Sequence, residues 1–400
     1  MNTQGRGKVI VLGCTHGGLA AIRSLGRSRL HVIAISYVPT EFGLGSRYIA
    51  EKAFCPHPED KRAFADFLLN GPRSWDGALI LETNDYFAAA LAEHKDELSQ
   101  KYRLITPDCD VTHTFLEKDK TYALADECDV PHPNIYEPQS MDDLNAIAGQ
   151  LKFPVMIKPV LSHEFVRIFG KKLIITEILG ELQAKFQQIL DAKQPVILSE
   201  IIPGTDYKTI EKLHVYVNSK GDICAEFFNV KLRQTPPMYG VVRVGKSVAP
   251  IKDVREYSHR LLKQSNYRGY ANLEFKRDPR DNIPKLMEVN IRMPRGLALP
   301  VASGVDFPWL IYQDIVLDQQ VTVMDYDHNT YLIEIVADVA DFLRYDQDRN
   351  LRRFVQPYLA RRKAFSEFSW SDPGPLFRQL RMRGLRFIRK TSGMKKQSFE

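Results

Sequence analysis

Short apolar runs alternate with amphipathic segments along the first hundred residues. The runs have the length of buried strands, and the segments between them carry apolar residues at helical spacing. Strands are predicted at 8–12, 30–36 and 77–81, and helices at 19–25, 62–69 and 85–98. Because strands that alternate with helices form parallel sheets covered by helices, this part of the chain is predicted to be an α/β domain.

A mixed pattern follows after residue 106. Helices are predicted at 110–128, 177–190, 253–264 and 308–317. Strands are predicted at 153–159, 173–175 and 195–202, through most of 207–248, and on both sides of a turn at 278–282. This order is typical of an α+β region.

Composition and charge add a third segment. The chain has 400 residues, of which 44% are apolar and 26% charged, as in ordinary globular proteins. Residues 349–400 contain 14 Lys or Arg and three Asp or Glu, a net charge of +11, whereas the rest of the chain carries −5. We therefore expect domains at 1–108 and 109–340, followed by a basic C-terminal segment at 341–400.

Two features that the sequence lacks bear on where in the cell the protein is expected. No run of about 18 apolar residues occurs, so no membrane-spanning helix is expected. The five cysteines are scattered and never spaced as Cys-x-x-Cys, which argues against a disulfide framework and favours a reducing, cytoplasmic setting. The mildly acidic main body argues against nucleic acid as a partner.

The hairpin near residue 280 carries the strongest chemical signal. A turn centred on Asp281 would place Glu274 opposite Glu288, with Glu288, Asn290 and Arg292 on the same polar face. Opposed carboxylates repel each other unless a cation lies between them. Two carboxylates and an amide suit Mg²⁺, and an arginine beside them suits a transferring phosphoryl group. The alternative is a solvated hairpin with two exposed glutamates.

Other candidates are weaker one by one. Lys158 ends an apolar strand and Lys120 begins a helix; each suits a phosphate chain, but each alone reads as a solvated lysine. The strand 198–202 runs into a Pro-Gly turn and offers backbone groups to a purine edge and a carboxylate to a ribose, although by itself this segment is better explained as a simple strand and turn. The glycines at 13–18 do not match Gly-x-Gly-x-x-Gly, and no acidic residue ends the second strand at Ser36, so a nicotinamide oxidoreductase is disfavoured.

In their order along the chain, these motifs resemble the ATP-grasp superfamily. The resemblance covers about residues 8–320 and is carried by Lys120 and the segments 130–133, 157–159, 199–206, 269–275, 286–292 and 304–308. It is nearest to the carboxylate–amine ligase type, similar to D-aspartate ligases and more distantly to biotin carboxylase and carbamoyl phosphate synthetase. The resemblance implies a Rossmann-like preATP domain followed by an ATP-grasp domain with two lobes.

The resemblance also implies roles for individual residues. Those expected to bind ATP are Lys120 and Lys158 (phosphates), Glu200, Ile201 and Ile202 (adenine) and Asp206 (ribose). Those expected to bind Mg²⁺, with Mn²⁺ as an alternative, are Glu274, Glu288 and Asn290, and Arg292 is expected to stabilise the acyl phosphate. Two departures are the lack of glycine in the lid segment 160–169 and Ile291 in place of the usual proline.

The implied reaction is phosphorylation of a carboxylate by ATP, followed by attack of an amine and release of ADP and phosphate. The expected partners are a small carboxylic acid and a small amine, and many relatives are homodimers. The alternative is an ATP-grasp regulatory or scaffold protein that binds nucleotide without turnover.

The basic C-terminal segment allows more than one interpretation. Residues 378–390 can form a helix with Leu380, Leu385 and Ile388 along one side and arginines around them. Such a helix can contact an anionic membrane, which would place the protein peripherally at the inner membrane surface. The alternatives are a helix packed on the body of the protein or a disordered end.

Overall fold

The computed structural model describes residues 7–159, 165, 168–171, 173–204, 209–236, 240–345 and 350–391. The chain forms two compact units: unit 1 comprises residues 1–129, 205–275 and 288–400, and unit 2 comprises residues 130–204 and 276–287. Both predicted domain borders, after residues 108 and 340, fall inside unit 1. The predicted three-part division therefore does not coincide with the compact units and stays a prediction.

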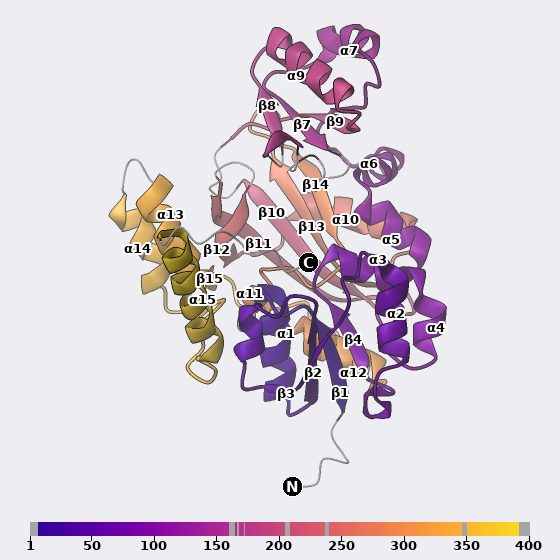
Figure 1. Cartoon of the computed structure of the whole chain (residues 1–400), viewed down its shortest axis with the longest axis vertical. Helices are drawn as coiled ribbons and strands as arrows, with labels where there is room; N and C mark the ends of the chain where they lie inside the picture. Colours follow the sequence, from indigo (N-terminus) through magenta and orange to yellow (C-terminus); the bar gives the residue numbers. More distant parts are fainter. Residues whose placement is uncertain are drawn as a thin grey trace. The chain divides into compact units, whose positions relative to one another are not determined.

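The N-terminal part of unit 1 contains the predicted parallel sheet (Figure 1). Its strand order is β3-β2-β1-β4-β5, with β1 (Lys8–Leu12), β2 (His31–Ser36), β3 (Ile49–Phe54), β4 (Leu79–Glu82) and β5 (Arg103–Leu104). Val9 on β1 pairs with Val32 on β2 and with Leu79 on β4. After β1 the chain continues to β2 and β3 on one side of β1 and then to β4 and β5 on its other side. The strand order therefore reverses between β1 and β4, and sheets of this kind bind ligands at the carboxyl ends of the strands at that point.

The helices around this sheet are α1 (His16–Arg27), α2 (Lys61–Leu69), α3 (Asp85–Glu93) and α4 (Lys95–Ser99). Phe64 of α2 and Phe87 of α3 are fully buried in one cluster with Ile10, Ile33 and Ile80 of the sheet. The predicted single helix at 85–98 is interrupted at His94. This cluster packs α2 and α3 against the strands β1, β2 and β4 in one core.

The glycines after β1 serve close packing. Gly13 has a φ of 85°, and a Cβ there would lie 2.4 Å from Thr83 Oγ1. A Cβ on Gly18 would lie 1.9 Å from the carbonyl oxygen of Gly13, and one on Gly17 would lie 2.7 Å from that of Pro294. Only glycine fits these positions, so the glycines of this turn allow close packing of the backbone.

A second, mostly antiparallel sheet has the order β14-β13-β10-β11-β12-β15-β16. Its strands are β10 (Ile210–Val217), β11 (Ile223–Thr235), β12 (Val241–Ser247), β13 (Gly269–Arg277), β14 (Pro284–Asn290), β15 (Tyr331–Ile333) and β16 (Lys363–Phe365). The predicted hairpin is present as β13 and β14. Asp278 N–H donates to Ile283 O (3.0 Å), so this closing bond is centred between Arg280 and Asp281.

Further helices of unit 1 are α5 (Cys109–Leu116), α6 (Lys118–Glu127), α10 (Lys252–Gln264), α11 (Ala298–Ser303), α12 (Phe307–Ile315), α13 (Ile335–Tyr345), α14 (Leu351–Leu359) and α15 (Gly374–Thr391). The predicted helix at 110–128 is divided because Glu117 has extended backbone angles (φ −98°, ψ 120°). The predicted helices at 253–264 and 308–317 are confirmed within two residues at each end.

Unit 2 has an antiparallel sheet with the order β6-β9-β7-β8. Its elements are β6 (Ile135–Tyr136), α7 (Met141–Ile147), β7 (Val155–Pro159), β8 (Ile174–Thr176), α9 (Leu179–Asp191) and β9 (Val196–Glu200). Leu144 of α7 and Phe186 of α9 are buried in one cluster with Ile157 and Leu198 of the sheet. The central strand β7, which ends at Lys158 and Pro159, is thereby held by sheet pairing and by this core.

The C-terminal region up to Thr391 is an integral part of unit 1. β16 pairs in parallel with β15, and the buried side chain of Arg23 on α1 donates to the Asp372 carboxylate (2.9 Å) and to the carbonyls of Ser366 (3.1 Å) and Glu367 (3.0 Å). A truncation at Asn350 would therefore remove the strand β16 and leave the buried guanidinium of Arg23 without its partners.

The predicted amphipathic helix at the C-terminus is present as α15, on which Leu380 is 47% exposed. The side chains of Leu385 and Ile388 lie outside the described residues. No helix in the described ranges is long and apolar enough to cross a membrane. Contact of this segment with a membrane surface stays a prediction.

Candidate active site

Glu274 lies on β13 between Lys231, which is buried, and Lys212, whose side chain is 14% exposed. Lys231 Nζ on β11 lies 2.7 Å from Glu274 Oε1, and Lys212 on β10 forms an ion pair with Oε2. Burial raises the pKa of Glu274, but the two lysines outweigh burial and lower it to about 2. The carboxylate is therefore charged at neutral pH and already surrounded by cationic groups.

The adjacent strand β14 carries Glu288 and Asn290. Glu288 is exposed, and Asn290 Nδ2 donates to Glu288 Oε1 (3.0 Å), which leaves the amide oxygen of Asn290 free to face a cation. Burial lowers the pKa of Lys212, and the charges of Glu274 and Glu288 oppose that shift. Both glutamates thus act on the same lysine, whereas the exact pairing of Glu274 with Glu288 stays a prediction.

Arg292 follows β14 and is held by the parallel sheet. Its Nε donates to Asp85 Oδ1 (2.9 Å), and Asp85 is the first residue of α3, directly after the carboxyl end of β4. Met293 N–H donates to the carbonyl oxygen of Glu82, the last residue of β4 (3.0 Å). The candidate catalytic arginine therefore sits at the switch point of the parallel sheet.

A buried network fixes the loop after Arg292. Glu334, which is fully buried, accepts from Arg295 Nε (2.5 Å) and from Arg243 Nη1 (3.1 Å). Arg295 Nη2 also lies 3.0 Å from His16 Nε2. Since arginine can only donate, His16 accepts at Nε2, and the first turn of α1 is tied to the same loop.

The residues expected to hold a divalent cation are only partly arranged for it. Carboxylate and amide oxygens are hard donors of the kind Mg²⁺ prefers, and Glu288 and Asn290 offer both kinds. The two oxygens of Glu274 are instead paired with Lys231 and Lys212. Within the described residues, no group of three or more His, Cys, Asp or Glu side chains is arranged to hold a metal.

Unit 2 carries another set of the expected nucleotide-binding residues. Lys158 Nζ on β7 lies 3.4 Å from Ser199 Oγ on β9. Glu200 ends β9; its side chain is only 7% exposed and pairs with Arg280 Nη2 at 2.7 Å. Ile201 and Ile202, which follow, are buried. Asp206 lies outside the described residues, so its expected contact with ribose stays a prediction.

Lys120 does not have the surroundings expected for a residue that binds phosphate. It lies in the first turn of α6, is 49% exposed and forms an ion pair with Glu117 Oε2 at 2.7 Å. The hydrogen bond with Glu117 raises the pKa of Lys120. In this structure Lys120 is a paired surface lysine, and its role toward ATP stays a prediction.

Unit 1 brings Glu274, Glu288, Asn290 and Arg292 onto neighbouring strands and the loop that follows. The sequence reasoning missed Lys212, Lys231 and Asp85, which contact them. A signal for Lys231 was present, because a lysine within the long apolar strand 223–235 needs a buried partner. Asp85 carried no such signal, since an acidic residue at a helix start is common.

The family model "ATP-grasp in the biosynthetic pathway with Ter operon" matches residues 241–336. The matched residues include β13 and β14, which carry Glu274 and Glu288. The chain has the ATP-grasp fold. The predicted resemblance and fold class are thereby confirmed.

The chain is similar in sequence to a D-aspartate ligase from Enterococcus faecium, with 26% identity over 263 residues. The match covers 63% of this chain and 62% of that ligase, so less than two thirds of the relative's length is represented.

Solved structures agree on the fold. N5-carboxyaminoimidazole synthetase from Staphylococcus aureus, complexed with ADP, is 12% identical and covers 86% of each chain with a TM-score of 0.64. The biotin carboxylase domain dimer of Hydrogenobacter thermophilus 2-oxoglutarate carboxylase, solved with MgADP, is 15% identical, with a TM-score of 0.62 over 81% of this chain and 73% of that one.

Proposed function

We propose that this ATP-grasp chain is an ATP-dependent carboxylate–amine ligase that works through an acyl phosphate. The observation that carries the proposal is the charged, buried Glu274 beside the Glu288–Asn290–Arg292 strand end. Desolvating such charged groups can cost more than their pairing returns, so the cluster is more readily explained by a binding site than by a gain in sheet stability. The sequence likeness to a D-aspartate ligase supports the same class of reaction.

The residues expected to bind the nucleotide have separate roles toward its phosphates, base and sugar. Lys158 and Lys120 would neutralise phosphate charge, Glu200 with Ile201 and Ile202 would meet adenine, and Asp206 would meet the ribose. A bound Mg²⁺ would supply charge neutralisation at the phosphates. Structures of relatives that contain ADP or MgADP support this choice of nucleotide, and Mn²⁺ stays an alternative.

The chain's own residues would then act on the reacting groups. Glu274, Glu288 and Asn290 would hold the cation, while Lys212 and Lys231 keep Glu274 ionised. Arg292, oriented by Asp85, would stabilise negative charge on the transferred phosphoryl group and on the acyl phosphate. Activation is needed because a free carboxylate is a poor acyl donor; attack of an amine on the acyl phosphate forms the C–N bond and expels phosphate.

The test is ADP release by the purified protein with MgATP and panels of small acids and amines. We expect release that depends on one acid and one amine, and Glu288→Gln should abolish it without unfolding the protein. Glu256→Gln, at an exposed glutamate of α10, is the matched control and should leave ADP release unchanged. Normal turnover by Glu288→Gln would refute the assigned site.

A different result would favour the non-enzymatic alternative. If MgATP binds and stabilises the chain but no pair of acid and amine releases ADP, the chain is an ATP-grasp binding protein rather than a ligase.

A further inference from the structure

The carboxylate of Glu274 is occupied by cationic groups of the protein itself. Lys231 Nζ on β11 lies 2.7 Å from Oε1, and Lys212 on β10 is paired with Oε2. Glu274 and Lys231 are buried, and most of the Lys212 side chain is covered as well. Both oxygens that this carboxylate would offer to a divalent cation therefore already contact an ammonium group.

The charges of this cluster balance each other without a bound ion. Glu288 on the adjacent strand β14 also interacts electrostatically with Lys212. The two ammonium groups of Lys212 and Lys231 thus face the two carboxylates of Glu274 and Glu288. A divalent cation that entered alone would add its charge beside two ammonium groups in a largely desolvated place, and like charges repel strongly there. The cluster therefore disfavours a cation that arrives without an anion.

A nucleotide changes this balance because it brings several negative charges. A lysine ammonium binds phosphate as a compact point charge. Mg²⁺ is in turn usually bound in proteins by one or two carboxylates together with the phosphates of a substrate. Phosphates can therefore take over the two ammonium groups while the cation takes over the carboxylate, so that every charge keeps a partner.

We propose that Lys212 and Lys231 hold Glu274 in place of a divalent cation and release it when nucleotide and cation bind together. The two lysines then bind phosphate, and the Glu274 carboxylate joins the oxygens of β14 at the cation. This inference rests on the proposed binding of MgATP and does not depend on turnover. It makes the cation and the nucleotide bind as a pair, because neither alone satisfies all the charges.

The test measures Mn²⁺ binding to the full chain by electron paramagnetic resonance, without and with ADP. In the wild type, ADP should raise the affinity for Mn²⁺ by about tenfold or more, as coupled ligands commonly do. Lys231→Met should strengthen Mn²⁺ binding without ADP by about tenfold, because one competing charge-assisted contact with Glu274 is lost. The factor by which ADP raises the Mn²⁺ affinity should fall by at least about tenfold in the same variant.

Lys212→Met should act in the same direction as Lys231→Met. Each single variant leaves one lysine as the partner of Glu274, so the carboxylate is not left unpaired, and urea unfolding checks the fold. A lysine with a purely structural role would not strengthen Mn²⁺ binding when it is removed. The wild type alone also tests the proposal, since equal Mn²⁺ affinities without and with ADP would overturn it.

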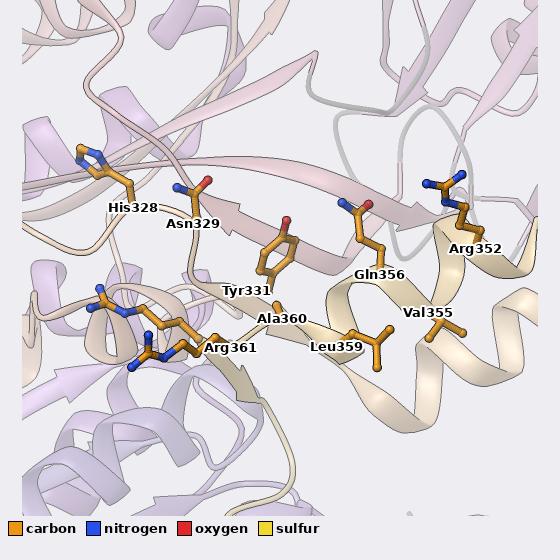
Figure 2. A pocket seen from close by; sticks show the side chains of 10 residues that line it. His328, Asn329, Tyr331, Arg352, Val355, Gln356, Leu359, Ala360 and Arg361 are labelled. Atoms are coloured by element: carbon orange, nitrogen blue, oxygen red, sulfur yellow. The ribbon is translucent and has the colours of Figure 1, made fainter.

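The control addresses a separate cavity of unit 1. This cavity, of about 630 Å³, lies between β15 and α14, with Arg352 near one end and Arg361 near the other (Figure 2). Arg352→Met removes an exposed positive charge from its wall and should change neither Mn²⁺ affinity. A fall in the effect of ADP as large as that in Lys231→Met would place the nucleotide in this other cavity and overturn the proposal.

The remaining outcomes separate this inference from the proposed reaction. Unchanged or weaker Mn²⁺ binding without ADP in both lysine variants would overturn the exchange, even if the wild type releases ADP with an acid and an amine. If the variants behave as expected but no acid and amine release ADP, the exchange stands and only the ligase reaction is refuted.

Discussion

At the scale of single residues, the site depends on partners that orient or charge the expected groups. Glu274 is charged because Lys212 and Lys231 contact it, and the ion pair with Asp85 fixes the orientation of Arg292. These contacts join strands and loops that are far apart in the sequence. Two of them lead to predictions that distinguish a positioning role from a purely structural one.

Asp85→Asn should reduce kcat for ADP release by about tenfold. The variant keeps the size of the side chain but loses a charge-assisted hydrogen bond at 2.9 Å, so Arg292 is less well oriented. The measurement is kcat together with the melting temperature. Asp66→Asn, which disrupts an exposed ion pair on α2, is the matched control and should change neither quantity appreciably. An unchanged kcat in Asp85→Asn would rule out the positioning role.

Glu274→Gln should destabilise the fold at neutral pH by about 3–5 kcal/mol, because two largely buried lysines lose their counter-charge. The pKa of Glu274 is about 2 in the folded state and near 4.3 when unfolded, so its stabilisation is present above about pH 4.3 and is lost as pH falls toward 2. Urea unfolding at several pH values should show the gap between variant and wild type narrowing below about pH 4.3. A gap independent of pH would contradict this account.

At the scale of elements, the C-terminal region differs most from the sequence-based view. Its helix α15 was expected, but β16 and the contacts of residues 366–372 with α1 were not. Arg23 is a buried arginine in the middle of α1, and its partners lie more than 340 residues later in the chain. The basic segment is thus a structural element up to Thr391 as well as a source of charge.

Arg23→Met should lower the free energy of unfolding by about 3–5 kcal/mol, because the buried Asp372 carboxylate would lose its guanidinium partner. Urea unfolding measures this. Arg27→Met, one turn further along the same helix and exposed, is the matched control and should change stability by less than about 0.5 kcal/mol. Equal effects of the two substitutions would show that the C-terminal region contributes little to stability.

At the scale of the whole molecule, nucleotide binding should stabilise the chain. MgATP at 100 times its dissociation constant should add about 2.7 kcal/mol and raise the melting temperature, whereas NADH should give no shift. Lys158→Ala should reduce the MgATP shift, and Lys152→Ala, at an exposed lysine of unit 2, should not. Stabilisation by NADH but not by MgATP would favour an oxidoreductase over a ligase.

Much of the fold could be predicted because its signals are local. The periodicity of apolar residues located β1, β2, β7, β13 and α10, since burial of one face imposes that pattern on neighbouring residues. The strand β3 was missed because its half-buried positions include the charged Glu51 while its exposed positions include the apolar Ala50 and Phe54, so polar and apolar residues do not separate by face. The break at Glu117 was missed because no glycine or proline marks it.

Local patterns along the chain were enough to predict the α/β start, the β13–β14 hairpin and the candidate site residues Glu274, Glu288, Asn290 and Arg292. Each of these predictions depends on alternation or order over a few neighbouring positions. The partners of the charged groups became visible only in the folded chain: Lys212 and Lys231 contact Glu274, Asp85 contacts Arg292, and Arg23 contacts Asp372. Ion pairs form between groups that are close in space, and a short-range pattern along the chain does not show which distant residues will be close.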